Sequence, residues 1–377
     1  GTIVDAGPGV TRGALTIVEG SLTLSGVSTY GGVTQIYQGA SLTLTGAGSI
    51  ADTLYVAFSP NSTGGVATFD ISGTTDGATV GGLLGTSSSG FGSVVLGSQT
   101  LTITKTMGAF RGNISGTGGL TLAASAAQAL SGVNAYTGAT MVGAGAMLVL
   151  YDNGSVAASS GVNLAGAGAS LDISGATSGR TIQDLAGVAG STILLGSNSL
   201  TVGTANNTTF AGVIADGGQD GGYGGSLIKQ GSGTLILTGT NTYTGGTTVL
   251  GGVLQGTTTS LQGNIVNNAT VTFNQSTDGT YFGTMSGSGS LTLTGSGNVT
   301  LAGANTYSGG TVVSGGTLTG TTTSLQGDIV NNASVVFDQA TDGTYAGVMS
   351  GDGVLTKTGV GTLILTANNT YTGGTII

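Results

Sequence analysis

The last part of the sequence consists of long tandem copies of one unit. The stretch GTLILTGTNTYTGGTTVLGGVLQ returns twice in close variants, so that Tyr243, Tyr307 and Tyr371 mark three copies at equal spacing. The intervening segment repeats as well, because residues 257–292 match residues 321–356 at 27 of 36 positions. Self-similarity at a fixed period indicates one structural unit stacked on itself, so the sequence predicts a solenoid. Looser versions of the tyrosine motif lie at residues 28–34 and 134–140.

Short runs of alternating residues fill the rest of the chain. In SLTLTG and TLILTG, aliphatic residues occupy every second position and Thr or Ser the positions between, which is the pattern of a half-buried strand. Gly, Asn and Asp-Gly punctuate the gaps and supply positive φ at tight turns. The alternation predicts that Asp172, between Leu171 and Ile173, faces solvent. It predicts an interior position for Leu235, Leu237, Leu291 and Leu293.

Equivalent strands reappear about 20 residues further along the chain, so consecutive strands cannot all pair as hairpins. A coil of roughly 20–22 residues with three short strands places each strand over its equivalent in the next coil. Because connections between parallel strands are almost always right-handed, we expect the coils to wind in a right-handed sense. The predicted fold is therefore all-β, a right-handed parallel β-helix of about 17–18 turns. In this scheme one copy of the long repeat makes three turns. The Asn of each NTY motif is predicted to be a corner residue in αL conformation that bonds to neighbouring backbone, and the Tyr hydroxyls are predicted to reach backbone.

The repeat is less regular in the first part of the chain. We expect irregular turns with loop insertions over residues 1–225 and regular tandem turns over residues 226–377, both in one continuous rod. Ala51–Gly65 is the expected insertion loop, and Ala215–Gly225 is expected to be a loop leaving the rod or a flexible joint. Both ends of the chain interrupt a pattern, so we expect a fragment of a longer protein.

Missing residue types exclude most chemistry. The chain has no His and no Cys, which removes Ser-His-Asp and Cys-His catalysis and the usual zinc and haem sites. Six basic residues against a formal charge of −9 argue against nucleic-acid binding. No apolar run of about 18 residues is present, so no helical membrane span is predicted. We therefore expect no catalytic residues, no cofactor and no metal.

The acidic residues fit turns better than a catalytic pair. Asp278 and Asp342 both lie in TDGTY, where Asp-Gly is a turn dipeptide. Asp216 and Asp220 are candidates for a calcium-binding turn, although their segment ADGGQDGGYGG lacks the calcium-binding nonapeptide repeat. The spaced tyrosines could form a sugar-stacking ladder, but a position covering the corners fits their spacing better.

The repeated motif resembles a known family. G-x-G-x-L-x-L-T-G-x-N-T-Y-T-G-G-T-T-V-x-x-G-x-L is similar to the autotransporter-associated β-strand repeat, also called the passenger-associated transport repeat. The matching segments are Gly231–Leu254, Gly295–Leu318, Gly359–Ile376 and, loosely, Gly118–Leu148, where Ala139 replaces the second Gly of the motif. The motif residues are Asn241, Tyr243, Gly245, Gly246, Asn305, Tyr307, Gly309, Gly310, Asn369, Tyr371, Gly373 and Gly374.

The resemblance implies the β-helical passenger of a Gram-negative type V autotransporter, at the cell surface or outside the cell. Its expected partners are its own C-terminal outer-membrane β-barrel, which the sequence does not include, and a host or bacterial surface or polysaccharide. We predict a non-catalytic structural rod that serves surface display, adhesion or a biofilm matrix. The alternatives are a self-assembling extracellular fibre subunit and a β-helical polysaccharide lyase or hydrolase.

Overall fold

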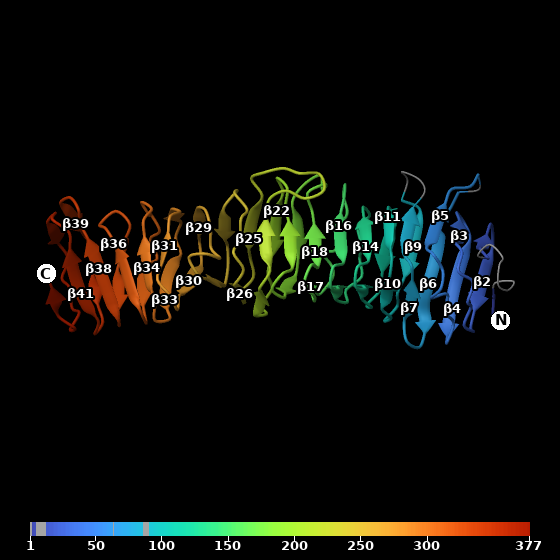
Figure 1. Ribbon diagram of the computed structural model, residues 1–377, viewed down its shortest axis with the longest axis horizontal. Helices are drawn as coiled ribbons and strands as arrows, with labels where there is room; N and C mark the ends of the chain where they lie inside the picture. The colour runs from blue at the N-terminus through green and yellow to red at the C-terminus, as the bar shows by residue number, and fades with distance from the viewer. Residues whose placement is uncertain (1, 5–12, 63, 86–89) are drawn as a thin grey trace. The chain divides into compact units, whose positions relative to one another are not determined.

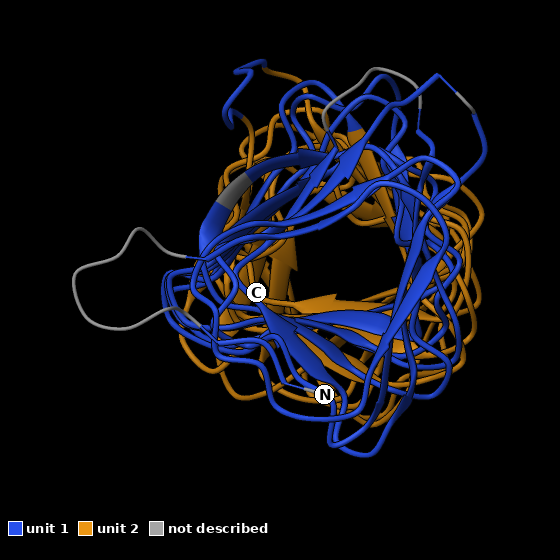
Figure 2. Ribbon diagram, turned by 90° about the vertical axis from the view of Figure 1, so that its right-hand side faces the viewer, with its two compact units in different colours: residues 1–198, 217–222 blue, residues 199–216, 223–377 orange. Residues whose placement is uncertain are grey.

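The computed structural model describes residues 2–4, 13–62, 64–85 and 90–377. These residues form 43 β-strands and contain no helix. The chain divides into two compact units, one of residues 1–198 and 217–222 and the other of residues 199–216 and 223–377. In both units the strands lie side by side in successive coils (Figure 1). Viewed along the axis about which the coils wind, each unit has several walls around an interior (Figure 2).

Four parallel sheets form the walls of the first unit, which also contains β19 (Arg180–Ile182). In spatial order, one sheet consists of β1 (Leu15–Ile17), β3 (Thr34–Tyr37), β5 (Val56–Ser59) and β8 (Leu83–Gly85). A second consists of β2 (Ser21–Leu24), β4 (Ser41–Gly46), β6 (Ala67–Thr74), β9 (Gly92–Val95) and β12 (Asn113–Ser115). A third consists of β7 (Ala78–Val80), β10 (Leu101–Ile103), β13 (Leu120–Leu122), β15 (Thr140–Val142), β17 (Gly161–Leu164) and β20 (Asp184–Gly187). The fourth consists of β11 (Thr106–Phe110), β14 (Ala127–Leu130), β16 (Met147–Leu150), β18 (Ser170–Asp172) and β21 (Thr192–Leu194).

The second unit is built in the same way and also contains β24 (Val213–Ala215). One sheet consists of β23 (Thr208–Phe210), β26 (Thr234–Leu237), β28 (Val253–Gly256), β30 (Thr270–Asn274), β33 (Ser290–Thr294), β35 (Thr311–Val313), β37 (Ile329–Asn331) and β40 (Met349–Ser350). A second consists of β22 (Ser199–Val202), β25 (Ser226–Lys229), β27 (Thr247–Val249), β29 (Ile265–Asn267) and β32 (Met285–Ser286). A third consists of β31 (Gly279–Tyr281), β34 (Asn298–Leu301), β36 (Thr317–Gly320), β38 (Ser334–Asp338), β41 (Val354–Thr358) and β43 (Thr375–Ile376). The pair β39 (Gly343–Tyr345) and β42 (Leu363–Leu365) completes the unit.

Strand pairing within each unit is parallel and mostly in register. Leu22 of β2 lies beside Leu42 of β4, its equivalent in the next coil. Coil length varies, because the step from Leu235 to Leu254 is longer by two positions than the step from Leu254 to Val271. The structure confirms the prediction of an all-β parallel β-solenoid of about 18 turns.

The long repeat does not make three turns, as the sequence had suggested. Along one sheet of the second unit, Leu235 pairs with Leu254, Leu254 with Val271 and Val271 with Leu291, so three turns end at Leu291. The sequence equivalent of Leu235 in the next copy is Val299, eight positions further on, and it lies in β34, which belongs to another sheet. The strands that follow the three NTY motifs accordingly lie in three different sheets: β27, β35 and β43. The prediction was wrong because it assumed coils of roughly 20–22 residues, whereas these three steps are 19, 17 and 20 residues long.

Aliphatic side chains fill the interior of each unit. Leu235, Leu237, Leu291 and Leu293 are at most 1 % exposed, as the alternation predicted. Burial of such a side chain contributes about 1.5–3 kcal/mol, and the parallel register stacks these contributions from coil to coil.

The two segments expected to be loops differ from each other. Ala51–Gly65 is not a loop throughout, because it contains the fully buried strand β5, which pairs with β3 and β8; its residue 63 lies outside the described residues. The run VAFS carries few polar residues and fits a buried strand, a signal that the nearby Pro60 obscured. Residues 216–225 do form a loop between β24 and β25. The predicted division at residue 225 and the single continuous rod stay predictions.

Candidate functional site: the repeated Asn-Tyr corner

The Asn of each NTY motif bonds to backbone groups of neighbouring coils. Asn241 is 2 % exposed; its Oδ1 accepts a hydrogen bond from Ile214 N at 2.8 Å, and its Nδ2 donates one to Ser260 O at 2.7 Å. These partners lie 27 residues before and 19 residues after it. One amide side chain therefore fastens three successive coils of the second unit, and we call this arrangement the Asn staple.

The staple recurs at Asn305 and Asn134, and the last copy of the motif keeps its bond to the preceding coil. Asn305 Oδ1 accepts from Met285 N, and Asn305 Nδ2 donates to Ser324 O, both at 2.7 Å. Asn134 in the first unit does the same with Ile114 N and Ser155 O. In the last copy Asn369 accepts from Met349 N at 2.7 Å and donates to Ala367 O at 3.1 Å.

The predicted αL conformation of these asparagines is wrong. Among the described residues other than glycine, only Ser125 and Asp152 have positive φ. The Asn side chains bond chiefly to backbone groups of neighbouring coils, and the local bonds that Asn134 and Asn369 add, to Gly132 O and Ala367 O, form without a left-handed backbone.

The Tyr of the motif lies in the interior, with its hydroxyl on a Thr four residues later. Tyr243 is 2 % exposed and its hydroxyl lies 2.5 Å from Thr247 Oγ1. The predicted bond from the Tyr hydroxyl to backbone is therefore wrong for Tyr243, whereas Tyr307 has a backbone hydrogen bond with Gln326 beside its bond with Thr311. The same pair recurs with distances of 2.6–2.7 Å: Tyr30 with Thr34, Tyr136 with Thr140, Tyr307 with Thr311 and Tyr371 with Thr375. The constant Thr in YTGGT was the sequence signal for this partner.

Burial raises the pKa of these phenols. Desolvation raises the pKa of Tyr243 to about 12, while the hydrogen bond with Thr247 acts in the opposite direction. It also raises the pKa of Tyr307 and of Tyr136. A buried Tyr that stays neutral at ordinary pH supports packing, and its ring is not available to stack on an external sugar.

Two adjacent glycines complete the corner, and each has its own reason. A Cβ on Gly245 would lie 2.2 Å from Gly224 O of the preceding coil, so the close approach of the two coils requires glycine there. Gly246 has a φ of +79°, a conformation that favours glycine. The pattern holds in the later copies: Gly309 and Gly373 approach the coil below, and Gly310 and Gly374 have positive φ.

The calcium candidates lie in different units. The carboxylate of Asp216 accepts hydrogen bonds from Gly225 N at 2.9 Å and Gly224 N at 3.2 Å, and from the Thr244 hydroxyl at 2.5 Å. These contacts make Asp216 a clamp on its own loop. Asp220 belongs to the segment that packs in the first unit. No cluster of three acidic side chains suited to a metal occurs in the described parts of the chain.

Asp172 was predicted to face solvent, but its side chain is fully buried. Residues 217–222 fold back over it, and Gln219 N donates to Asp172 Oδ2 at 2.8 Å. Ser174 N and Ser174 Oγ donate to Oδ1 at 2.8 and 2.7 Å. A loop 47 residues away in sequence therefore covers a strand face that the alternation marks as external.

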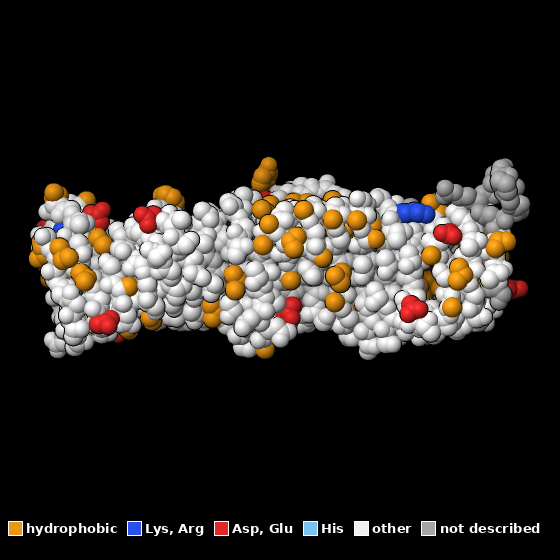
Figure 3. Space-filling model, turned by 60° about the horizontal axis from the view of Figure 1, so that its bottom comes forward, with side chains coloured by type: hydrophobic (Ala, Val, Ile, Leu, Met, Phe, Trp, Pro, Cys, Tyr) orange, Lys and Arg blue, Asp and Glu red, His pale blue; other side chains and the backbone are white. Residues whose placement is uncertain are grey.

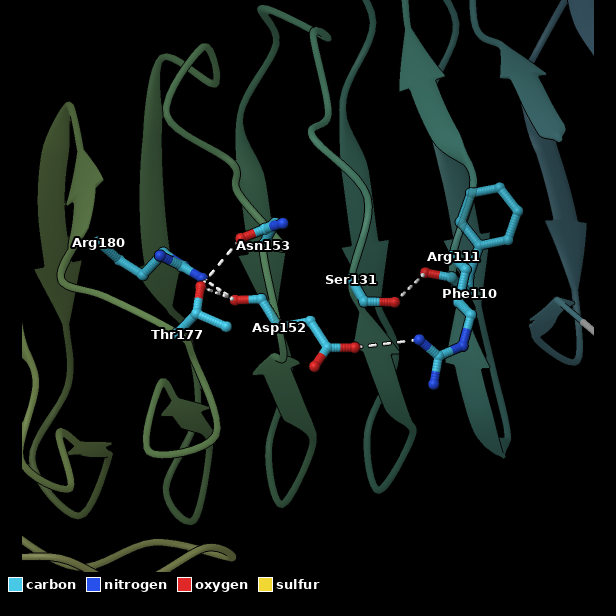
Figure 4. Close-up of polar contacts among 7 residues, drawn as sticks. All are labelled: Phe110, Arg111, Ser131, Asp152, Asn153, Thr177 and Arg180. Carbon is cyan, nitrogen blue, oxygen red and sulfur yellow. Dashed lines mark hydrogen bonds and ion pairs between the residues drawn. The ribbon is translucent and has the colours of Figure 1, made fainter. Parts of the chain in front are cut away.

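A polar cluster on the first unit joins several coils (Figure 4). Arg111 forms an ion pair with Asp152 at 3.0 Å, and Arg180 donates to the main-chain oxygen of Asp152. The ion-paired side chains are 36 % and 43 % exposed, so their pairing contributes at most about 1 kcal/mol. Thr177 holds the same turn through Asn153 at 2.9 Å. The cluster fastens coils and contains no pair of groups suited to acid–base work.

Charged side chains are sparse on the outside. On the face in Figure 3, uncharged polar side chains and backbone predominate and acidic groups stand alone. The described residues contain no helix that is long and apolar enough to cross a membrane.

A family model described as Passenger-associated-transport-repeat matches residues 19–44, 227–255, 291–319 and 355–377. The chain carries passenger-associated transport repeats. Three of the matched segments contain the NTY motifs described above, and the fourth contains Tyr30. The loosely matching segment Gly118–Leu148 is not among the matched residues, although Asn134 and Tyr136 make the same contacts there.

One curated relative is the adhesin BmaC autotransporter of Brucella suis biovar 1 (strain 1330), 37 % identical over 196 residues. The similarity covers 44 % of this chain and 6 % of the relative, so the chain spans a small part of that protein. No solved structure matches the chain. This passenger-repeat protein is thus a β-solenoid similar, over part of its length, to an autotransporter adhesin.

Proposed function

We propose that this chain is a structural segment of an autotransporter passenger, displayed on the surface of a Gram-negative bacterium and serving adhesion. The observation that carries the proposal is the use made of the passenger repeats: their Asn residues bond to neighbouring coils, their Tyr residues pack in the interior, and their paired Gly residues permit the close approach and the turn at the corner. Because the recurring residues of the repeat serve the stacking of one coil on the next, the repeat acts to extend a solenoid. The similarity of part of the chain to an autotransporter adhesin supports adhesion as the role of its outer surface.

A non-catalytic role fits the residue types. The chain lacks His and Cys, and the carboxylates of Asp172 and Asp216 accept hydrogen bonds that hold loops. Asp278 Oδ1 and Asp342 Oδ1 each accept from a backbone N–H of the next coil, at 2.9 and 2.7 Å. Carboxylates occupied in this way serve turns and coil contacts.

The family repeat also supports the partners that we propose. An outer-membrane β-barrel in the same protein would carry the passenger outward, and a host or bacterial surface would be its target. The nearly uncharged exterior favours contacts through hydroxyl and amide groups over charge-driven binding to anionic surfaces.

The test uses the full-length protein on its own cells. Deletion of residues 1–377 is compared with the intact protein and with the triple variant Asn241→Ala, Asn305→Ala and Asn369→Ala. We expect the deletion to reduce adhesion to host cells and to bacterial lawns, and the triple variant to reduce the amount of passenger displayed.

Unchanged adhesion after the deletion, with display of the remaining passenger intact, would refute the proposal. Filaments that grow with the concentration of the purified chain would favour a fibre subunit instead. Cleavage products from a panel of polysaccharides would favour a lyase or hydrolase.

A further inference from the structure

A groove opens on the second unit between two loops of adjacent coils. One loop, residues 257–264, connects β28 to β29, and the other, residues 275–283, leads from β30 through β31. The cavity between them measures about 600 Å³. This volume is within the range of sites that take small molecules or short segments of a chain.

The floor of the groove is held rigidly. Gln275 is 3 % exposed; its Oε1 accepts a hydrogen bond from Thr258 N at 3.0 Å, and its Nε2 donates to Thr258 Oγ1 at 3.2 Å. Tyr281 OH donates to Gly263 O at 2.7 Å and ties the second loop to the first. The groove is therefore part of the folded frame.

Hydroxyl and amide groups line the walls. Within the described residues, the hydroxyls of Thr277 and Thr280 make no hydrogen bond, and the amide nitrogen of Asn264 donates to no atom. Asp278 supplies the one carboxylate of the lining, and no cationic side chain lines the groove. This chemistry suits a neutral ligand rich in hydroxyl groups and does not suit an anion.

A large aromatic ring lies on the same lining. Phe282 is 80 % exposed, in the turn between β31 and β32. A flat aromatic face beside hydroxyl and amide groups is complementary to a sugar ring, whose C–H face packs on the aromatic ring while its hydroxyls exchange hydrogen bonds.

The next copy of the repeat shows that the frame does not need this ring. Gln339 makes the same two bonds to Thr322, at 3.0 and 3.2 Å. The residues equivalent to the groove lining, one repeat later, are identical except at Asp328, Ala340 and Ala346, which replace Asn264, Ser276 and Phe282. The frame is common to both copies, whereas the exposed ring and two polar groups belong to the first copy alone.

We propose that this groove binds a neutral carbohydrate chain, with Phe282 as the stacking platform and the free Thr and Asn groups as hydrogen-bond partners. The proposal rests on the proposed adhesive function in that it names a ligand class for it. Binding by the purified chain is measured without cells, so it can fail while adhesion stands.

The experiment probes the purified chain of 377 residues against an array of neutral glycans. The array includes chitohexaose, cellohexaose and maltohexaose, with oligogalacturonate and extended decapeptides alongside. We expect binding to at least one neutral glycan and a loss of at least tenfold in affinity for Phe282→Ala. The thermal midpoint of that variant should match the parent, because Ala346 occupies the equivalent position in the same frame.

The second copy supplies the matched gain-of-function variant. Asp328→Asn, Ala340→Ser and Ala346→Phe together should raise the binding stoichiometry from one to two. Parental affinity in Phe282→Ala, binding of peptides alone, or no binding to any neutral glycan would overturn the proposal.

Discussion

Replacement of one Asn staple provides a direct test of the coil-to-coil bonding. Asn241→Ala removes both bonds of the staple and leaves Ile214 N–H and Ser260 C=O without partners in the interior, where both residues are fully buried. A buried polar group without a partner costs about 1–3 kcal/mol. We therefore expect a local loss of about 2–6 kcal/mol for the two groups together.

The loss should be measured locally, because the coils of a solenoid need not unfold as one unit. Hydrogen exchange followed by mass spectrometry reports the opening of the peptides that contain residues 214 and 260. A loss of about 2 kcal/mol corresponds to roughly thirtyfold faster exchange at the Ile214 amide. Peptides several coils away should exchange as in the parent.

Asn268→Ala is the matched control. Asn268 is exposed and accepts one long hydrogen bond, from Ser288 N at 3.3 Å. Its loss should change exchange by less than about fivefold, since a solvated bond of this kind contributes under about 1 kcal/mol. Equal effects of the two variants, or a change in Asn241→Ala that stays below threefold, would refute the staple.

Three further predictions concern the same coils. Because the pKa of Tyr243 is raised from 10.0 to about 12, its neutral phenol stabilises the folded state fully below pH 10. About 2–3 kcal/mol of that stability is lost as the pH rises from about 10 to about 12; Tyr243→Phe should lose less over this range in circular-dichroism titrations, and an equal loss would count against the burial argument. Gly245→Ala brings a Cβ to 2.2 Å from Gly224 O and should cost about 1–3 kcal/mol in urea unfolding, so parental stability would contradict the close approach. Asp172→Ala should make limited proteolysis within residues 217–222 at least tenfold faster, because it removes the carboxylate that accepts from Gln219 N. Asp220→Ala, the control in the same loop, should leave the rate unchanged, and equal rates in the two variants would contradict the role of Asp172 in holding this loop.

Much of the fold could be predicted from local patterns. Alternation at Leu235 and Leu237 identified an interior column, and the recurrence of similar strands at intervals of one coil required parallel stacking. Both signals are short in range and arise from the strand period itself. The corner motif could be located for the same reason, since its letters recur in every copy.

Contacts made between coils could not be predicted. The alternation correctly places the Asp172 side chain on the outer face of its strand. The alternation contains no information about residues 217–222, the loop that covers this side chain. The burial of Lys229 could not be predicted either. Its side chain is 1 % exposed, and its Nζ donates hydrogen bonds to the carbonyls of Gln230, Gly231 and Gly251. The partners of Asn241 lie in other coils, and the sequence specifies those contacts only after the coil lengths are known.

The eight positions by which each repeat exceeds three turns have a consequence for recognition. Successive copies turn their equivalent loops toward a different side of the second unit. A flat target that approaches from one direction meets the same loop in only one copy of three. Binding to several copies at once would therefore favour a flexible ligand that winds around the solenoid. Duplication of the repeat would first place the same loop on a further side of the unit, and only later copies would raise the avidity on any one side.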